Sequence, residues 1–174
     1  MPNLVLLILL TAFPALSTDM YLPALPTLQQ LWHISMAEAN VSLIAFFAVF
    51  SLFLLVHGPL SDRFGRRPVL IWGIVLYVAG SLLCSAAPNI AMLVLARIVQ
   101  AIGAAAASAL ALALAKDLYV GLARQKVLAY IGVLLPLCPM AAPMFGGLML
   151  RVMSWRAIFV CQALLALPAL YGVL

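Results

Sequence analysis

The chain has 174 residues, of which 68% are hydrophobic and only 7% are charged, and its mean hydropathy is +1.25. A soluble domain of this length has too little interior to bury so much apolar surface, so the composition excludes the soluble globular class. The formal net charge of +5 comes from basic residues that gather mainly in two segments, which we interpret as membrane topology signals rather than as a nucleic-acid-binding surface.

About six apolar runs are long enough to cross a hydrocarbon core of roughly 30 Å, which takes about 20 helical residues. We therefore expect an all-α integral membrane bundle with helices at approximately 4–24, 40–57, 69–87, 89–115, 127–149 and 157–174. The first run has the position of a signal peptide, but it lacks a preceding basic region, and Asp19 and a Pro-rich segment follow its apolar core. We predict a membrane helix there.

The first predicted helix carries an acid near its outer end, Asp19, in the segment Ser17-Thr-Asp-Met-Tyr-Leu-Pro23. Burying an ionised side chain in a membrane costs at least roughly 3 kcal/mol, so an acid at this depth is by default a functional-site hypothesis. The alternative is a helix-end residue that is solvated in the interfacial region or caps local backbone.

The segment between the second and third predicted helices, 58–68, holds one acid and three arginines. We expect a short loop here, because Gly58, Pro59, Gly65 and Pro68 are helix breakers. The positive-inside tendency places this loop and 116–126 in the cytoplasm, and 25–39, 87–89 and 150–156 outside, so the N-terminus is cytoplasmic. The inner loops then hold Arg63, Arg66, Arg67, Lys116, Arg124 and Lys126, and the outer loops hold Arg151 and Arg156.

The fourth predicted helix contains a second ionisable residue within a membrane segment, Arg97. A functional role is one interpretation of Arg97; the alternative is that its side chain extends to the outer headgroups and is solvated there. At 100° per residue, Arg97, Gln100, Ala104 and Ser108 fall on one side of the helix, which predicts an inward polar stripe. Since Arg97 and Asp19 lie at similar depth, we expect them to face one polar cavity. The small residues 103–108 favour close packing of a neighbouring helix.

The fifth predicted helix contains many helix-breaking residues, which indicates a hinge or a kinked seal. Membrane helices tolerate such breaks only where neighbours or a cavity satisfy the freed carbonyls. Packing alone is the alternative, but it requires the glycines and not the prolines. The residues concerned are Pro136, Pro139, Pro143, Gly146 and Gly147.

Other chemistry has little support in the sequence. Cys84, Cys138 and Cys161 fall inside apolar runs, so we expect neither a disulfide nor a metal site. The chain has no histidine cluster, no paired carboxylates and no nucleophile beside a base, and we therefore predict that it is not an enzyme. His33 and His57 lie near the membrane boundaries, where we expect interfacial roles.

The segment from Gly58 to Leu70 resembles the signature of the loop between helices 2 and 3 in the major facilitator superfamily. The matching residues are Gly58, Asp62, Arg63, Gly65, Arg66 and Arg67. Arg97 with Gln100 and Gly103 resembles the fourth-helix motif that is linked to proton transfer in that family. The fifth helix resembles the antiporter motif at Pro139, Pro143, Gly146 and Gly147, except that Ala142 stands where a glycine usually precedes the proline.

Two further segments resemble the bicyclomycin and chloramphenicol resistance (Bcr/CflA) type of drug/proton antiporters. They are Asp19-Met-Tyr-Leu-Pro-Ala-Leu-Pro26 and Trp155-Arg-Ala-Ile-Phe159. The resemblance implies the N-terminal six helices of a twelve-helix, multi-pass transporter of the bacterial inner membrane, whose partner in the fold is a C-terminal six-helix half.

The same resemblance implies proton-coupled export of drugs or amphipathic small molecules by alternating access, with the proton as coupling ion and no other cofactor. The proton-coupling cavity would be formed by Asp19, Arg97, Gln100 and Ser108. The 58–68 segment would gate this cavity through a charge lock; the alternative is that the segment only anchors the topology. A proton-coupled importer or a metabolite exporter of the same superfamily is the alternative function. The residues do not indicate which substrate is carried.

Overall fold

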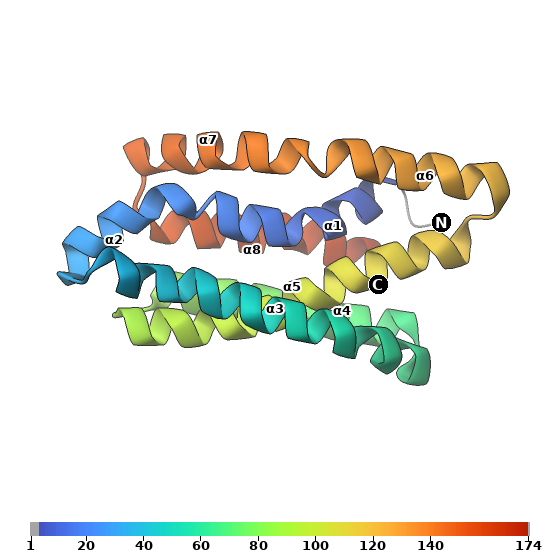
Figure 1. The fold of residues 1–174 in the computed structure, drawn as a ribbon, viewed down its shortest axis with the longest axis horizontal. Helices are drawn as coiled ribbons and strands as arrows, with labels where there is room; N and C mark the ends of the chain where they lie inside the picture. The colour runs from blue at the N-terminus through green and yellow to red at the C-terminus, as the bar shows by residue number, and fades with distance from the viewer. Residues whose placement is uncertain (1–3, 174) are drawn as a thin grey trace.

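The computed structural model describes residues 4–173, and within them every regular element is helical. Six stretches of this part of the chain are long and apolar enough to cross a membrane, and they form a bundle of roughly antiparallel rods (Figure 1). The elements are α1 (Leu4–Asp19), η1 (Leu22–Ala24), α2 (Leu25–Trp32), α3 (Met36–Phe64), α4 (Arg66–Ala86), α5 (Ile90–Leu118), α6 (Gly121–Leu134), α7 (Leu137–Val152) and α8 (Arg156–Val173).

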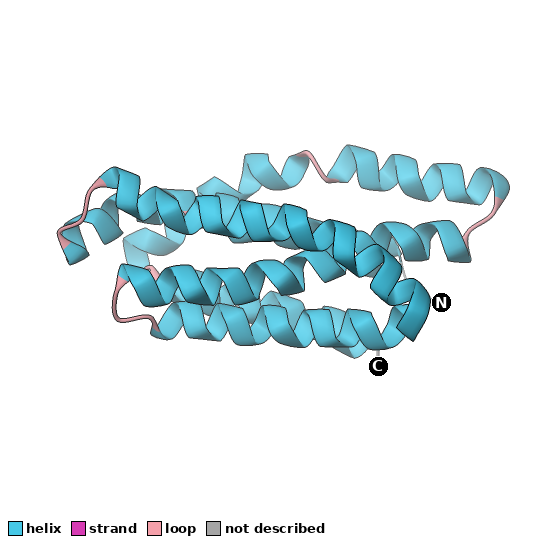
Figure 2. Cartoon of the chain, turned by 60° about the horizontal axis from the view of Figure 1, so that its bottom comes forward, coloured by secondary structure: helices cyan, strands magenta, loops and turns pink. Residues whose placement is uncertain are grey.

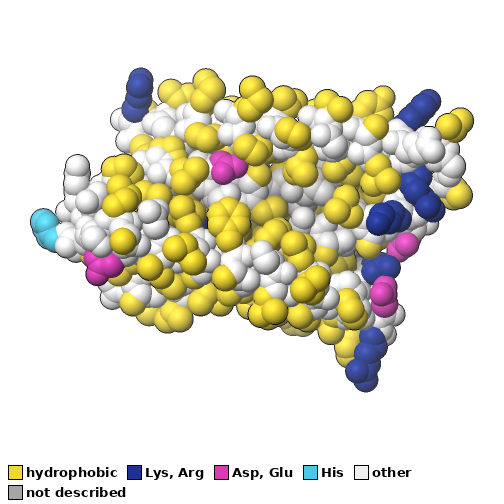
Figure 3. Space-filling view, in the orientation of Figure 1, with side chains coloured by type: hydrophobic (Ala, Val, Ile, Leu, Met, Phe, Trp, Pro, Cys, Tyr) yellow, Lys and Arg dark blue, Asp and Glu magenta, His cyan; other side chains and the backbone are white. Residues whose placement is uncertain are grey.

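The long helices are joined by short connectors at the two ends of the bundle, as Figure 2 shows. Two of the six spans are interrupted: α1, η1 and α2 together form the first, and α6 and α7 form the fifth. Most of the Lys and Arg side chains visible in Figure 3 gather at one end of the molecule, and hydrophobic side chains are spread over the face between the ends. Such a surface suits contact with lipid or with another apolar protein surface.

The segment 58–68 is helical almost throughout, which corrects the expectation of a loop. Helix α3 continues through Gly58 and Pro59 to Phe64, and α4 begins at Arg66. Gly65 alone separates them, with φ 94°, a conformation that favours glycine. Pro68 lies in the first turn of α4, where a missing N–H costs nothing because that donor has no partner inside the helix.

The two interruptions each lie one turn before a proline. Helix α1 ends at Asp19, four residues before Pro23, and the break between α6 and α7 begins at Leu135, four residues before Pro139. A proline cannot donate to the carbonyl four residues earlier, and its ring collides with that carbonyl. The expected disruption of the fifth span is therefore present, but Pro139 and Pro143 themselves lie inside α7.

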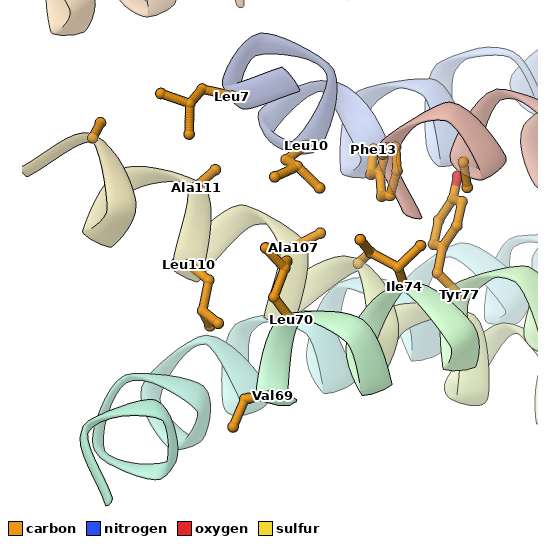
Figure 4. Packing of buried hydrophobic residues seen from close by; sticks show 14 of the residues in the cluster. Leu7, Leu10, Phe13, Val69, Leu70, Ile74, Tyr77, Ala107, Leu110 and Ala111 are labelled. Atoms are coloured by element: carbon orange, nitrogen blue, oxygen red, sulfur yellow. The ribbon is translucent and has the colours of Figure 1, made fainter. Parts of the chain in front are cut away.

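A hydrophobic core joins α1, α4 and α5 (Figure 4). Leu10 and Phe13 of α1 point toward α4, where Ile74 and Tyr77 lie, and Ala107 of α5 belongs to the same cluster. The rings of Phe13 and Tyr77 stack with centroids 4.5 Å apart. This core holds the first and middle turns of α1 against the alanine-rich part of α5 that follows Arg97 and Gln100.

Small residues bring the backbones of α4 and α5 into close contact. A Cβ atom on Gly80 would lie 2.5 Å from the backbone nitrogen of Gln100, and one on Gly103 would lie 2.3 Å from the backbone nitrogen of Tyr77. No side chain fits at either position without moving a helix. This seam fixes the depth and rotation of α5, and with them the positions of its polar side chains.

Candidate functional site

Arg97 lies at the centre of the bundle, with 0% of its surface exposed. Its guanidinium carbon lies 4.1 Å from the ring centroid of Tyr21, 5.3 Å from that of Phe46 and 5.1 Å from that of Phe159. The π faces of aromatic rings attract a cation, most strongly where water is excluded. The three rings therefore offset part of the cost of burying this charge.

The guanidinium also holds the end of α1. Its Nη1 donates to the carbonyl oxygen of Ser17 at 2.7 Å and to Oε1 of Gln100 at 2.9 Å. The Ser17 carbonyl has lost its usual helical donor, since the N–H of Tyr21 bonds to the Thr18 carbonyl instead. Arg97 thus replaces the donor that the break in the helix removes. Its Nε and Nη2 atoms are buried and have no hydrogen-bond partner among the described residues.

Gln100 extends this contact into a network across four helices. Its Nε2 donates to Ser81 Oγ of α4 at 2.8 Å and to Gln162 Oε1 of α8 at 2.9 Å. Gln162 Nε2 in turn donates to the carbonyl oxygen of Leu16 on α1 at 3.0 Å. Each of these side chains is at most 1% exposed. Unsatisfied backbone is costly away from water, so this network stabilises the interrupted α1.

Two tyrosines join the network from its edges. The hydroxyl of Tyr77 lies 2.7 Å from Ser17 Oγ, and that of Tyr21 lies 3.0 Å from Ser42 Oγ of α3. Ser17 therefore contacts α4 through its side chain and α5 through its carbonyl oxygen. These bonds fix the rotation of the last turn of α1, and so the direction in which its neighbours point.

Asp19 lies on the other side of that turn. Positions 17 and 19 are about 200° apart around a helix, so Asp19 points away from the side that Arg97 caps. The carboxylate is half-buried and accepts from Thr18 Oγ1 at 3.3 Å. Within residues 4–173 it forms no ion pair with Arg97. The two residues thus have different partners here, Thr18 for Asp19 and Ser17 with Gln100 for Arg97, and a shared cavity stays a prediction.

Asp19 belongs to a region where the two interrupted spans meet. Helix α7 packs against both α1 and η1. A Cβ atom on Gly146 would lie 2.2 Å from the carbonyl oxygen of Met20, so only glycine permits this approach. Ala142 is buried one turn earlier on α7, whereas Gly147 has open space around it. Of the two glycines predicted to matter here, packing therefore requires Gly146 but not Gly147.

The remaining predicted cavity residue, Ser108, is half-buried further along α5 and is not part of the Arg97 network. The sequence reasoning also missed several partners of that network. Gln162 had a usable signal, because a glutamine inside an apolar run needs a hydrogen-bond partner in the membrane. Tyr77 and Ser81 carried no comparable signal, since tyrosine and serine are frequent in membrane helices.

A second cluster lies where α3 and α5 end and α4 begins. Arg66 bridges Asp62, at 2.8 Å through Nη2, and Asp117 of α5, at 3.1 Å through Nε, and it also donates to Ser61 Oγ. Arg67 Nε donates to the carbonyl oxygen of Val173 on α8 at 2.9 Å. The predicted charge lock thus includes bonds between helix ends within this part of the chain, and Asp117 is a member that the sequence did not reveal.

Other members of the segment contribute differently. Gly58 accepts a 2.8 Å hydrogen bond from Ser61 Oγ through its carbonyl, and open space surrounds its Cα. Arg63 is exposed, and its guanidinium carbon lies 5.3 Å from the centroid of the Phe64 ring. Asp62 and Arg66 therefore form the ion pair, whereas Arg63 is directed elsewhere.

Comparison with known sequences places this site in a family context. Residues 7–174 match the sequence model of the Major Facilitator Superfamily. The chain is 36% identical over 156 residues to the uncharacterized MFS-type transporter YdgK of Bacillus subtilis, covering 88% of this chain and 39% of that protein. It is 34% identical over 146 residues to a chloramphenicol resistance protein of Pseudomonas aeruginosa, covering 83% of this chain and 35% of that protein.

A third relative is the multidrug resistance protein MdtL of Klebsiella pneumoniae, 33% identical over 141 residues, with 81% of this chain and 36% of that protein covered. The chain thus spans less than half of the length of these relatives. Among solved structures, a D-xylose-proton symporter superposes with a TM-score of 0.82 at 18% identity, covering 99% of this chain and 47% of that one. At this identity the likeness establishes the fold alone.

Proposed function

The chain belongs to the major facilitator superfamily, and we propose that it is the N-terminal half of a bacterial inner-membrane exporter of drug-like, amphipathic small molecules. Its six apolar spans are half of the twelve expected for the full transporter. Relatives named for chloramphenicol and multidrug resistance, at 34% and 33% identity, support a drug-like substrate. The proposal requires a second six-helix half that supplies the rest of the substrate cavity.

The observation that carries proton coupling is the half-buried Asp19 at the break in the first span. A carboxylate with no cationic partner in the described chain, beside an interrupted helix, is suited to take up and release a proton as access to the cavity alternates. Arg97 acts as a positioning residue: it holds the α1 terminus through Ser17 and so fixes where Asp19 points.

The Arg66 cluster supplies the conformational part of the mechanism. Its bonds join the last turns of α3 and α5 to the first turn of α4. Asp19, at the end of α1, is not part of this cluster. We infer that the cluster biases the balance between inward-facing and outward-facing states. The basic residues at this end of the bundle support a cytoplasmic position for it and for the N-terminus.

The direct test uses the purified full-length protein reconstituted in vesicles, with an imposed pH gradient and chloramphenicol as the probe. Exchange of the drug against protons, abolished when the gradient is collapsed, is the expected result. Movement of drug and protons in the same direction would instead identify an importer. Drug movement that is insensitive to the gradient would show that transport is not coupled to protons. The sugar symporters that share this fold do not favour import here, because the likeness is one of fold alone.

A further inference from the structure

A separate groove runs between α3 and α4 on the outer surface of the bundle, at the end that carries the Arg66 cluster. Its volume is about 480 Å³, and its walls include Phe53, His57 and Phe64 of α3 and Trp72 of α4. Ile102 of α5 also lines it. Trp72 is 68% exposed and Phe64 is 59% exposed. The groove is thus an open apolar channel and does not include Asp19 or Arg97.

The length of the groove matches one leaflet of a bilayer. Phe53 and Phe64 are eleven residues apart on one continuous helix, which corresponds to about 16 Å at 1.5 Å per residue. Half of a hydrocarbon core of roughly 30 Å is about 15 Å. An extended acyl chain lying in the groove therefore reaches from the bilayer middle to the headgroup level at Phe64.

Charge at the headgroup end is distributed unevenly. Around α3, Asp62 lies about 170° from the centre of the stripe that lines the groove, and Arg63 about 90° from it. Asp62 is neutralised by Arg66, whereas Arg63 forms no ion pair within residues 4–173. The guanidinium of Arg63 lies against the ring of Phe64, which is itself part of the groove wall. The mouth therefore presents an unpaired positive charge.

We propose that this groove binds an anionic phospholipid, with one acyl chain along α3 and α4 and its phosphate at the guanidinium of Arg63. Arginine is suited to this role because its planar donors match a phosphate in a bidentate geometry. The zwitterionic lipids that fill most of a bilayer offer the same chains without the net negative charge. This inference is independent of the proposed substrate and of proton coupling.

The test places the full-length protein in vesicles of phosphatidylcholine with added phosphatidylglycerol, in which one lipid or the other carries brominated acyl chains. Bromine quenches a tryptophan that it touches. Subtracting the signal of a Trp72→Phe variant isolates the contribution of Trp72. We expect phosphatidylglycerol to occupy the site about fivefold more strongly than phosphatidylcholine, equivalent to about 1 kcal/mol for one basic residue.

The Arg63→Gln variant should reduce that preference to about one, while Arg151→Gln, an exposed arginine at the other end of the bundle, should retain it. Native mass spectrometry of the same variants provides a second readout, in which the parent keeps phosphatidylglycerol and Arg63→Gln loses it. Equal quenching by both lipids, or a preference that survives Arg63→Gln, would overturn the proposal. Absence of any quenching at Trp72 would also overturn it, because the groove would then be covered by protein.

Discussion

Arg97 on α5 donates a 2.7 Å hydrogen bond to the carbonyl oxygen of Ser17, two residues before the acid that ends α1. A charged side chain thus completes the backbone of an interrupted helix in a neighbouring span. The relationship offers a reason for burying a cation that has no carboxylate partner among residues 4–173. We propose that Arg97 positions the end of α1.

Replacing Arg97 by Ala should loosen that end. The Ser17 carbonyl and Gln100 Oε1 would each lose their Arg97 bond, and the three rings would border a void. We expect a loss of about 1–3 kcal/mol in the free energy of unfolding of the full-length protein. Hydrogen exchange should also accelerate at the amides that follow Asp19.

Thermal unfolding in detergent and exchange detected by mass spectrometry measure these two effects. Arg151→Ala is the matched control, because Arg151 is an exposed arginine near the end of α7. Unchanged exchange after Asp19 in Arg97→Ala would contradict the capping role.

Gly146→Ala should disturb the contact between the two interrupted spans, whereas Gly147→Ala should not. The new Cβ at position 146 would lie 2.2 Å from the carbonyl oxygen of Met20, while nothing lies within 4 Å at position 147. Backbone cannot yield as a flexible side chain does, so we expect about 1–3 kcal/mol of destabilisation for the first variant alone. Thermal unfolding compares the two neighbours directly, and equal behaviour would contradict the packing shown here.

Gly80→Ala should separate α4 from α5. Its Cβ would lie 2.5 Å from the backbone nitrogen of Gln100, so the bond from Gln100 to Gln162 should weaken along with the seam. We expect a lower yield of folded protein and a loss of about 1–3 kcal/mol in the free energy of unfolding. Gly132→Ala on α6, where the site is open, should leave stability unchanged or slightly higher.

Asp117→Asn should alter transport through conformation rather than through affinity. The change removes the charge that ties Arg66 to the end of α5. Both side chains are partly exposed, so stability should fall by less than about 1 kcal/mol. Asp62→Asn and Arg66→Ala should act in the same direction.

Drug binding to the purified full-length protein, measured beside transport in vesicles, separates the two effects. Lys126→Ala, at the same end of the bundle, is the control and should match the parent. Loss of affinity in step with transport, with unchanged accessibility of the two faces, would show that the cluster does not gate.

The sequence predicted the architecture well because its strongest signals are local. Apolar length and the Arg-rich segment around Gly65 were sufficient for a bundle of six spans, and family motifs identified Arg97 and Gln100 as functional candidates. Element ends were less predictable. Pro68 is a helix breaker by type, yet it lies in the first turn of α4, where a missing N–H costs nothing. Pro59 lies inside α3, and the helix continues through it to Phe64.

The partners of each site residue were not predictable, because they depend on how helices rotate against one another. Asp19 and Arg97 share a depth in the membrane, which suggested a common cavity. The bond between Ser17 and Tyr77 sets the rotation of α1, and the Gly80 contact with Gln100 sets that of α5. In the resulting arrangement Arg97 contacts Ser17 and Gln100, whereas Asp19 contacts Thr18. Gln162 and Asp117 were not predicted as partners for the same reason: their contacts with Gln100 and Arg66 depend on the tertiary arrangement of the helices.

The most direct test of the central claim, that Asp19 carries the coupled proton, is the release of protons on adding drug to the purified full-length protein in weakly buffered solution. Asp19→Asn should bind drug but release no protons, because an amide has none to exchange. Glu38→Gln, an exposed acid in the first turn of α3, should release protons as the parent does. Proton release that persists unchanged in Asp19→Asn would contradict the account.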